Sequence, residues 1–393
     1  MPVADPGLTD AASTGPHAGM ETRAAILRAM GAARPYADSR PLSIETVTLD
    51  PPGPGEVQVR IRAAGLCHSD LSVINGDRPR PLPMALGHEA AGEVEVLGEG
   101  VDDLSVGDHV VMVFMPSCGH CSPCAEGRPA LCEPGAAANG RGELLTGGQR
   151  LHVGGEVLHH HLGCSAFAER AVVSRRSLIR IDPALPFDQA ALFGCAVLTG
   201  VGAVVNTAGV RPGQSVAVVG LGGVGLASVL GALACGASPV VAVDLSEDKL
   251  ALARTLGPVH TVNAGDADAV EQVRALTGGG AEVVVEMAGS ARALEASWKM
   301  TRRGGTTVTA GLPPPDATLP VNIVGLVAEE RTLKGSYIGT CVPSRDLPRY
   351  VALFREGRLP VDRLMSGSLP LDRINEGFDR LAEGSVARLV VTL

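Results

Sequence analysis

Four cysteines are crowded into one short segment of this chain. They follow the spacing C-x2-C-x2-C-x7-C, as Cys118, Cys121, Cys124 and Cys132. Thiolates bind Zn2+ in a closed tetrahedron, so four sulfurs that leave no vacant position make a structural site. The alternative is a disulfide cluster, but we expect no secretory segment here, and closely spaced cysteines in a reducing cytosol more often hold metal. The spacing therefore predicts a structural zinc loop, and any reaction must take place elsewhere.

Length and charge limit the kind of protein and its partners. The 393 residues fit two domains of about 100–200 residues each. The formal net charge is −9, and the charged residues are scattered without a basic block. This pattern disfavours nucleic acid and anionic membranes as partners and leaves a small-molecule substrate.

Two segments could be mistaken for membrane or targeting signals. Residues 212–243 contain no charged residue, but seven glycines and two prolines interrupt them, as in a buried βαβ unit. Residues 1–21 are polar and rich in Ala, Gly and Pro, without an apolar core or an Arg-rich amphipathic pattern. We expect them to form a loose N-terminal extension of a cytoplasmic protein.

The first half of the chain is predicted to be β-rich. Between Thr46 and Val113, short segments such as Val57–Ile61 and Gly92–Val96 alternate with Pro/Gly/Asp turns, which indicates a small antiparallel barrel. Residues 135–163 have weak periodicity and are expected to form an irregular loop, followed by a strand at Phe167–Val173.

From about Ala196 the pattern changes to alternating strands and helices, which is typical of a doubly wound parallel sheet. The predicted elements are Ser215–Val219, Gly223–Cys235, Pro239–Val243, Glu247–Leu256, Glu282–Val285 and Thr306–Ala310. A helix at Arg349–Glu356 and a strand at Arg388–Leu393 are expected to rejoin the first domain. The predicted division is a catalytic domain of residues 22–196 and 338–393 and a nucleotide-binding domain of residues 197–337.

A glycine-rich turn follows the first strand of the second domain. Its sequence is Gly220-Leu221-Gly222-Gly223-Val224-Gly225, and it opens a helix of small residues. A lone G-x-G-x-x-G is weak evidence, but the flanking strand and helix are those that dinucleotide binding requires. Gly220 permits the tight turn, Gly222 lets the backbone approach the pyrophosphate, and Gly225 lets the helix lie close to the strand.

An acidic residue indicates which dinucleotide binds. Asp244 ends the next strand, 19 residues after Gly225, where a carboxylate would accept hydrogen bonds from the adenosine ribose and repel a 2′-phosphate. Lys249 is expected to reach the 3′ side of the same ribose. The alternative is that Asp244 caps the helix that starts near Ser246. We predict NAD and not NADP.

Three further potential metal ligands are far apart in the sequence, namely Cys67, His88 and Cys195. Two sulfurs and one imidazole would leave zinc one open position, as a catalytic site requires. Taken singly, each has a simpler interpretation as a small buried cysteine or a satisfied core histidine.

The order of these motifs resembles that of the zinc-dependent medium-chain alcohol dehydrogenases. Gly87-His88-Glu89, the four-cysteine loop, GCxxxTG at Gly194–Gly200 and the GLGGVG turn occur in that family's order, over about residues 24–393. The long interval between Cys132 and Cys195 is similar to the animal/plant-like branch. The resemblance implies a GroES-like β-rich catalytic domain, a Rossmann coenzyme domain, NAD, and two zinc ions per chain. It also implies a homodimer, with a tetramer as the alternative.

The resemblance assigns roles to individual residues. Cys67, His88 and Cys195 correspond to the catalytic zinc ligands, and the four loop cysteines to the structural zinc ligands. Cys164, Cys235 and Cys341 are left over. The implied reaction is NAD-linked hydride transfer from a zinc-bound alkoxide, which interconverts alcohols with aldehydes or ketones.

Residues around the zinc ligands also match family positions. Ser69 corresponds to the hydroxyl that begins the proton relay, with a simple turn serine as the alternative. Asp70 corresponds to the carboxylate that orients the ligand histidine, and Glu89 to an acid behind the metal. His68 and Arg388 match positions that meet the pyrophosphate, where a histidine holds it more loosely than an arginine. Many relatives end the relay with a histidine where this chain has Ser72, so the proton must leave through water or another group such as His68.

The pocket positions suggest a substrate class. Phe114 corresponds to one aromatic wall, and the segment from His159 to Leu162 to a second, although its histidines could equally form a solvated loop. Because Ser69 is smaller than threonine, we expect room for aryl and secondary alcohols beside primary ones.

Two rival functions remain open. A glutathione-formaldehyde dehydrogenase would carry a basic anchor after the structural zinc, where this chain has the apolar run at residues 136–138. A non-catalytic NAD-binding relative would not need the three ligands and Ser69.

Overall fold

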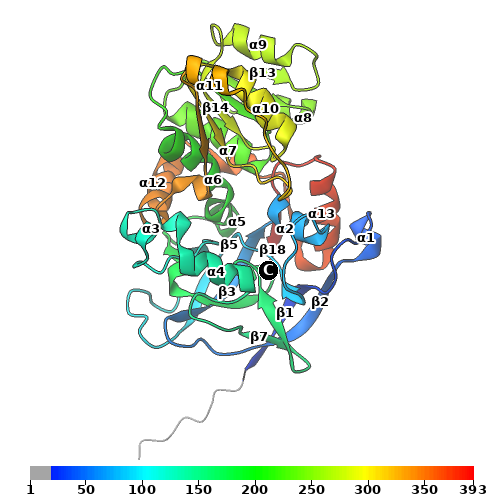
Figure 1. The fold of residues 1–393 in the computed structure, drawn as a ribbon. Helices are drawn as coiled ribbons and strands as arrows, with labels where there is room; N and C mark the ends of the chain where they lie inside the picture. The colour runs from blue at the N-terminus through cyan, green and yellow to red at the C-terminus, as the bar shows by residue number, and fades with distance from the viewer. Residues whose placement is uncertain (1–18) are drawn as a thin grey trace, which may run out of the picture.

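The computed structural model describes residues 19–393, which form two domains, one above the other in Figure 1. The predicted N-terminal extension lies outside the described residues except for its last three. Of these, Met20 and Glu21 already belong to the first strand, β1 (Met20–Leu27). Among the described residues no single helix is long and apolar enough to cross a membrane, while one bent pair, Phe187–Gly194 with Ala196–Ala208, meets the length and composition criteria together.

A closed five-stranded barrel begins the first domain, in the order β1-β2-β7-β8-β4. Its strands after β1 are β2 (Leu42–Leu49), β4 (Met84–Ala85), β7 (Leu151–Val153) and β8 (Glu156–His160). β1 and β2 are antiparallel, with Met20 opposite Leu49 and Leu27 opposite Leu42. Alternate side chains such as Ala24, Ile26 and Leu158 fill the interior, because successive residues of a strand face opposite sides.

The second sheet of this domain has seven strands, in the order β10-β6-β5-β3-β18-β17 with β9 also paired to β3. These strands are β3 (Glu56–Gly65), β5 (Ala90–Leu97), β6 (His109–Met112), β9 (Arg170–Ser174), β10 (Leu178–Arg180), β17 (Ser368–Pro370) and β18 (Val390–Thr392). The predicted barrel strands Val57–Ile61 and Gly92–Val96 lie in β3 and β5 of this sheet and not in the closed barrel. The end of the chain joins it through β18, which is antiparallel to β3.

The prediction of an irregular loop at residues 135–163 is wrong. Helix α4 (Glu133–Arg141) occupies its start, and β7 and β8 close the barrel in its second half. Gly142, with φ of 68°, ends α4 in the left-handed conformation. The helix has nine residues and each strand five or fewer, so neither is long enough for its periodicity to stand out.

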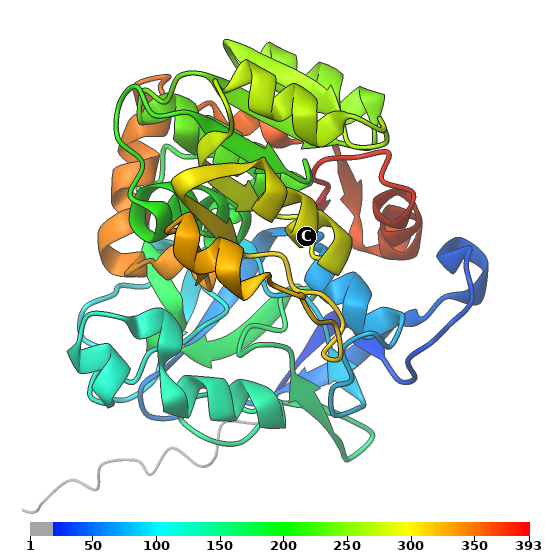
Figure 2. The same ribbon diagram turned by 45° about the horizontal axis from the view of Figure 1, so that its top comes forward.

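The second domain is a six-stranded parallel sheet in the order β13-β12-β11-β14-β15-β16. Its strands are β11 (Val216–Val219), β12 (Val240–Asp244), β13 (Val259–Asn263), β14 (Ala281–Glu286), β15 (Thr301–Thr309) and β16 (Thr332–Gly335). Helices α7 (Gly223–Ala234), α8 (Glu247–Thr255), α9 (Ala269–Leu276) and α10 (Ala291–Met300) connect them and cover the sheet (Figure 2). The sequence order reverses at β11, and a doubly wound sheet binds its ligand at such a switch point, beyond the carboxyl ends of the strands.

Candidate active site between the domains

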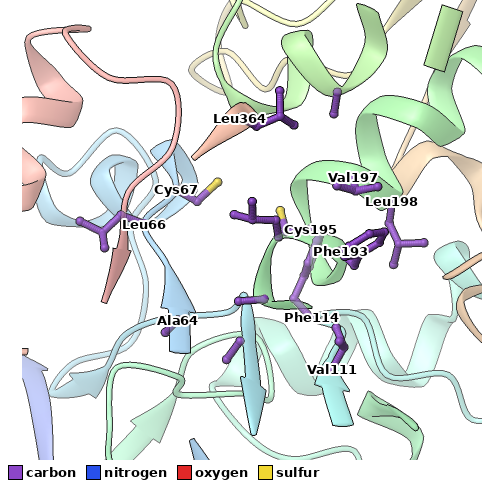
Figure 3. Packing of buried hydrophobic residues seen from close by; sticks show 14 of the residues in the cluster. Ala64, Leu66, Cys67, Val111, Phe114, Phe193, Cys195, Val197, Leu198 and Leu364 are labelled. Atoms are coloured by element: carbon purple, nitrogen blue, oxygen red, sulfur yellow. The ribbon is translucent and has the colours of Figure 1, made fainter. Parts of the chain in front are cut away.

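Cys67, His88 and Cys195 meet at the cleft although they come from three separate parts of the chain. Cys67 lies between β3 and α2 (His68–Ile74), His88 follows β4, and Cys195 precedes α6 (Ala196–Gly202). Their ligand atoms, together with a carboxylate oxygen of Glu89, all lie within 4.8 Å of one another, and all four residues are buried. Figure 3 shows the sulfurs of Cys67 and Cys195 directed toward the space between them.

Charge within this cluster favours thiolate. A hydrogen bond from the Cys195 thiol lowers the pKa of Cys67 well below its usual value, against the effect of burial and with help from the Arg388 charge. The same hydrogen bond and burial raise the pKa of Cys195. A cation held between the two sulfurs in place of a thiol proton would stabilise both as thiolates.

Asp70 fixes the orientation of His88. Its Oδ1 lies 3.0 Å from His88 Nδ1 and 3.1 Å from His161 Nδ1. Backbone N–H groups of Cys67 and Gly87 also donate to this buried carboxylate. Burial raises the pKa of Asp70, but the charges and hydrogen bonds of His88 and His161 have a larger, opposite effect. The pKa of Asp70 is therefore lower than its usual value. Because Nδ1 of His88 is engaged, its Nε2 is the atom left to bind a metal.

Glu89 is a buried acid with no hydrogen bond to its side chain. Neither carboxylate oxygen has a hydrogen-bond partner, and the nearest cation is Arg388, with Nη1 at 3.5 Å. Burial raises the pKa of Glu89 to about 7, although the Arg388 charge opposes this effect. An unpartnered carboxylate beside two sulfurs and an imidazole is a donor set that fits zinc.

The four-cysteine loop also fits a metal. The four sulfurs lie within 4.8 Å of one another, and those of Cys121 and Cys132 are 3.9 Å apart. Tetrahedral zinc with bonds of about 2.3 Å would place two sulfurs about 3.8 Å apart. Backbone N–H groups of Cys118 and Gly135 donate to the Cys132 sulfur. These donors stabilise a thiolate, and the site is closed, as a structural site would be.

A cavity of about 400 Å³ separates the two domains beside the first cluster. Its catalytic-domain wall includes Cys67, His68, Ser69, Ser72, Phe114, Cys195 and Arg388, and its coenzyme-domain wall includes Gly220, Gly222, Gly223, Val224, Gly225, Asp244 and Lys249. Asp70, His88 and Glu89 lie behind this surface. Leu162 is buried in the core and is not part of the lining.

The glycine turn has the geometry that the sequence predicted. Gly220 has φ of +90°, and a Cβ there would approach the backbone nitrogen of Ala288 to 2.6 Å. A Cβ on Gly225 would meet the carbonyl oxygen of Gly220. A Cβ on Gly222 would instead enter open space, so the first turn of α7 is left accessible to a phosphate.

Asp244 ties the turn to the next strand. Its Oδ2 accepts a hydrogen bond from the Leu221 N–H at 2.6 Å, and its Oδ1 accepts one from the Ser246 N–H at 2.9 Å. Ser246 Oγ accepts from the Lys249 N–H and so caps α8. Because the cap belongs to Ser246, the Asp244 carboxylate keeps free lone pairs at the cavity.

Arg388 connects the two walls. Its Nη1 donates to the carbonyl oxygen of Leu66 at 2.8 Å, and its guanidinium lies against Gly223 at the start of α7. His68, the first residue of α2, is exposed at the same cavity. Both predicted pyrophosphate contacts thus lie beside the glycine turn.

Comparisons with known proteins agree with this geometry. Residues 53–183 match the alcohol dehydrogenase GroES-like domain, and residues 223–356 match the zinc-binding dehydrogenase model. The crystal structure of an alcohol dehydrogenase zinc-binding domain protein from Burkholderia ambifaria is 36% identical, with a TM-score of 0.89, and the match covers 95% of this chain and 99% of that one. The chain belongs to the zinc-dependent medium-chain alcohol dehydrogenase family.

Two other solved members of the alcohol dehydrogenase family illustrate its range. Benzyl alcohol dehydrogenase from Acinetobacter calcoaceticus is 30% identical, with a TM-score of 0.89 and coverage of 95% of this chain and 99% of its own. A zinc-binding dehydrogenase from Sinorhizobium meliloti 1021, bound to NADP, is 27% identical, with a TM-score of 0.76 and coverage of 95% and 100%.

Sequence reasoning missed part of this dehydrogenase's cavity. Arg78, Thr199, Met287, Leu312 and Tyr337 also line it. His161 was expected only as part of a second pocket wall or a solvated loop, but it is buried against Asp70, and His160 is buried beside it. Thr199 belongs to the GCxxxTG segment, which could have pointed to it. The other residues lie in no motif with fixed spacing, so only the tertiary structure reveals them.

Proposed function

We propose that this dehydrogenase interconverts alcohols with aldehydes or ketones, using NAD and a catalytic zinc, and that aryl and secondary alcohols are among its substrates. The observation that carries the proposal is the convergence of Cys67, His88 and Cys195, whose two cysteines line one wall of a cavity that the glycine turn lines on the opposite side. A metal site and a dinucleotide site that share one cavity are what hydride transfer requires.

The residues present divide the work as follows. Cys67, His88 and Cys195 would hold the catalytic zinc and the loop cysteines the structural zinc. When bound, the catalytic zinc supplies Lewis acidity and NAD supplies the hydride acceptor. Asp70 holds the His88 ring, and Phe114 stands edge-on to it, with ring centroids 5.3 Å apart. Gly222 and Arg388 would hold the pyrophosphate.

Ser69 is the group that would take the proton of the alcohol, because it lines the cavity and lies two residues after Cys67 in the chain. The neighbouring Ser72 does not extend the relay, since its Oγ donates to the carbonyl oxygen of His68 at 2.9 Å. The proton would therefore leave through the solvent in the cavity or through the exposed His68 imidazole.

Asp244 supports NAD over NADP, because a carboxylate at the end of β12, on the cavity wall, would repel a 2′-phosphate. The NADP-bound relative from Sinorhizobium meliloti makes NADP the alternative. A screen of primary, secondary and aryl alcohols with each coenzyme, together with zinc analysis of the same sample, tests the proposal. The expected result is NAD-linked oxidation at about two zinc ions per chain; activity that persists after the catalytic zinc alone is removed would contradict it.

Two other functions make different predictions. A glutathione-formaldehyde dehydrogenase would oxidise formaldehyde only when the thiol is added, and the apolar residues 136–138 of α4 provide no anchor for such an adduct. A non-catalytic relative would bind NAD without oxidising any alcohol.

The edge of the parallel sheet supports a homodimer, with a tetramer as the alternative. Edge strand β16 is exposed along its length, and Ile323, Val324 and Val327 of α11 (Ile323–Ala328) are each more than 70% exposed beside it. An uncovered strand edge and an apolar helix face favour pairing with a second copy. Light scattering on the purified protein measures the number of chains in the assembly.

We also propose that the enzyme works in the cytoplasm.

A further inference from the structure

Two arginines, Arg78 and Arg80, lie on the loop after α2, and the first of them lines the cavity. Arg78 lines the cavity together with Phe114 and Tyr337. Its Nη2 donates to the carbonyl oxygen of Leu312 at 2.9 Å. Leu312 belongs to the coenzyme domain, so this hydrogen bond crosses the space between the two domains. This is the single hydrogen bond of the Arg78 guanidinium within residues 19–393, and Arg80, two residues later, makes none there.

No carboxylate forms an ion pair with either arginine in the described part of the chain, although Asp77 also lines the cavity. Within residues 19–393 neither arginine takes part in an ion pair, although Arg and Lys side chains form 21 ion pairs with carboxylates in that part of the chain. Asp77 is the nearest acid in sequence, and its carboxylate instead accepts from Asn75 Nδ2 at 2.8 Å. Burial, followed by the charge of Arg80, lowers the pKa of Arg78. The half-buried Arg78 guanidinium therefore faces the cavity with one hydrogen bond and no ion pair, and a bound anion would supply the missing partner.

The cavity wall between the sulfurs and the arginines is aromatic. Phe114 contacts the His88 ring, and its own ring stands edge-on to that of Tyr337 at a centroid distance of 6.0 Å. A flat ring is the group that such a wall packs against best. The pyrophosphate would lie elsewhere, at Gly222 and Arg388, so the cofactor's phosphates do not account for the two charges.

We propose that Arg78, with Arg80 beside it, binds a carboxylate on the substrate, so that the preferred substrates are aryl alcohols or aldehydes that carry a carboxylate away from the reacting carbon. The guanidinium fork matches a carboxylate in shape and keeps its charge at any pH of interest. This inference rests on the proposed function, because it names the substrate class for the same site.

The test compares two substrates that differ in one group. For the zinc-loaded, full-length enzyme with saturating NAD, kcat/KM is measured for 4-carboxybenzyl alcohol and for benzyl alcohol. The wild type should prefer the carboxylate. Arg78→Gln should lower the ratio of the two values about tenfold to a hundredfold, the usual range for a lost charge-assisted hydrogen bond. Arg80→Gln should lower it less, and Arg78→Lys should restore part of it.

Arg211→Gln is the matched control. Arg211 is exposed and lies outside the cavity, and its substitution removes the same positive charge as Arg78→Gln. Arg78→Glu should shift the preference toward 4-(aminomethyl)benzyl alcohol, which a merely misfolded variant could not do. Binding provides a second readout: calorimetry with the NADH-loaded enzyme should show that terephthalamate binds more tightly than terephthalamide in the wild type and not in Arg78→Gln.

The outcomes separate the two levels of the argument. If the wild type oxidises benzyl alcohol but does not prefer the carboxylate, the inference is overturned and the proposed function stands. If Arg78→Gln slows both substrates equally, Arg78 only holds the domains together through Leu312, and the inference again fails. If no alcohol is oxidised with either coenzyme, the proposed function itself is wrong.

Discussion

Asp70 Oδ1 lies 3.0 Å from Nδ1 of His88, and both residues are completely buried behind the cavity. This contact engages Nδ1 of the histidine and leaves Nε2 free, so Asp70 orients the ring from behind the cavity lining. A carboxylate in this position usually supports metal affinity or activity by a factor of about 10–100.

The first prediction follows from this contact. Asp70→Asn should lower zinc occupancy of the cysteine-histidine site or kcat/KM by about 10–100-fold, because an amide holds the imidazole less firmly and withdraws a buried negative charge. Zinc content and steady-state kinetics measure it. Asp102→Asn, at an exposed position, is the control. Unchanged zinc content and activity in Asp70→Asn would mean that Asp70 does not orient His88.

The second prediction concerns the loop cysteines. Cys121→Ser should reduce zinc by about one ion per chain and lower the melting temperature, because a closed four-sulfur site contributes directly to folding. Cys235→Ser, which lies outside both clusters, should keep the metal content of the wild type. Metal analysis with thermal denaturation checks both variants. Full zinc content in Cys121→Ser would contradict a structural zinc here.

The third prediction concerns coenzyme choice. Asp244→Asn should lower the ratio of kcat/KM for NAD to that for NADP by about tenfold or more, since it removes the charge that repels a 2′-phosphate and weakens charge-assisted hydrogen bonds to the ribose. Asp248→Asn, exposed in the first turn of α8, is the matched control. A preference that stays the same in Asp244→Asn would show that another residue selects the coenzyme.

The fourth prediction concerns stability against acid. His160 is buried, its Nε2 accepts from the Arg150 N–H, and its Nδ1 faces Ser165 Oγ. Burial, with the charge of Arg150, lowers its pKa to about 3. In the unfolded chain the pKa is about 6.5, so between these values the unfolded state binds more protons. The contribution of His160 is therefore present above about pH 6.5 and is lost as the pH falls, by about 2 kcal/mol between pH 7 and pH 5.

Urea denaturation at several pH values measures this loss. His160→Gln keeps an acceptor for the Arg150 N–H without a titrating ring, so its free energy of unfolding should fall less between pH 7 and pH 5. His120→Gln, at an exposed histidine, is the control. Identical slopes for the wild type and His160→Gln would contradict the assignment.

Short motifs were predictable because their geometry is local. The glycine turn and the four-cysteine loop each span fewer than 20 residues, and their chemistry depends on backbone that the same segment supplies. The helix α4 and strands β7 and β8 were missed because each is too short to show a period, and the barrel strands were misassigned because pairing partners are set by tertiary contacts. The pocket position of Leu162 was inferred from family likeness, and its side chain lies in the core.

By itself, the sequence determined the family, the two-domain fold, the closed sulfur loop and the phosphate-binding turn, because spacing along the chain is enough to specify them. The tertiary structure alone decided what converges: Cys67 with Cys195, His161 on Asp70, and Arg78 on Leu312, 234 residues away. The physical reason is that these contacts form only when the two domains and the sheets within them pack, and no local pattern records the distance across a cleft.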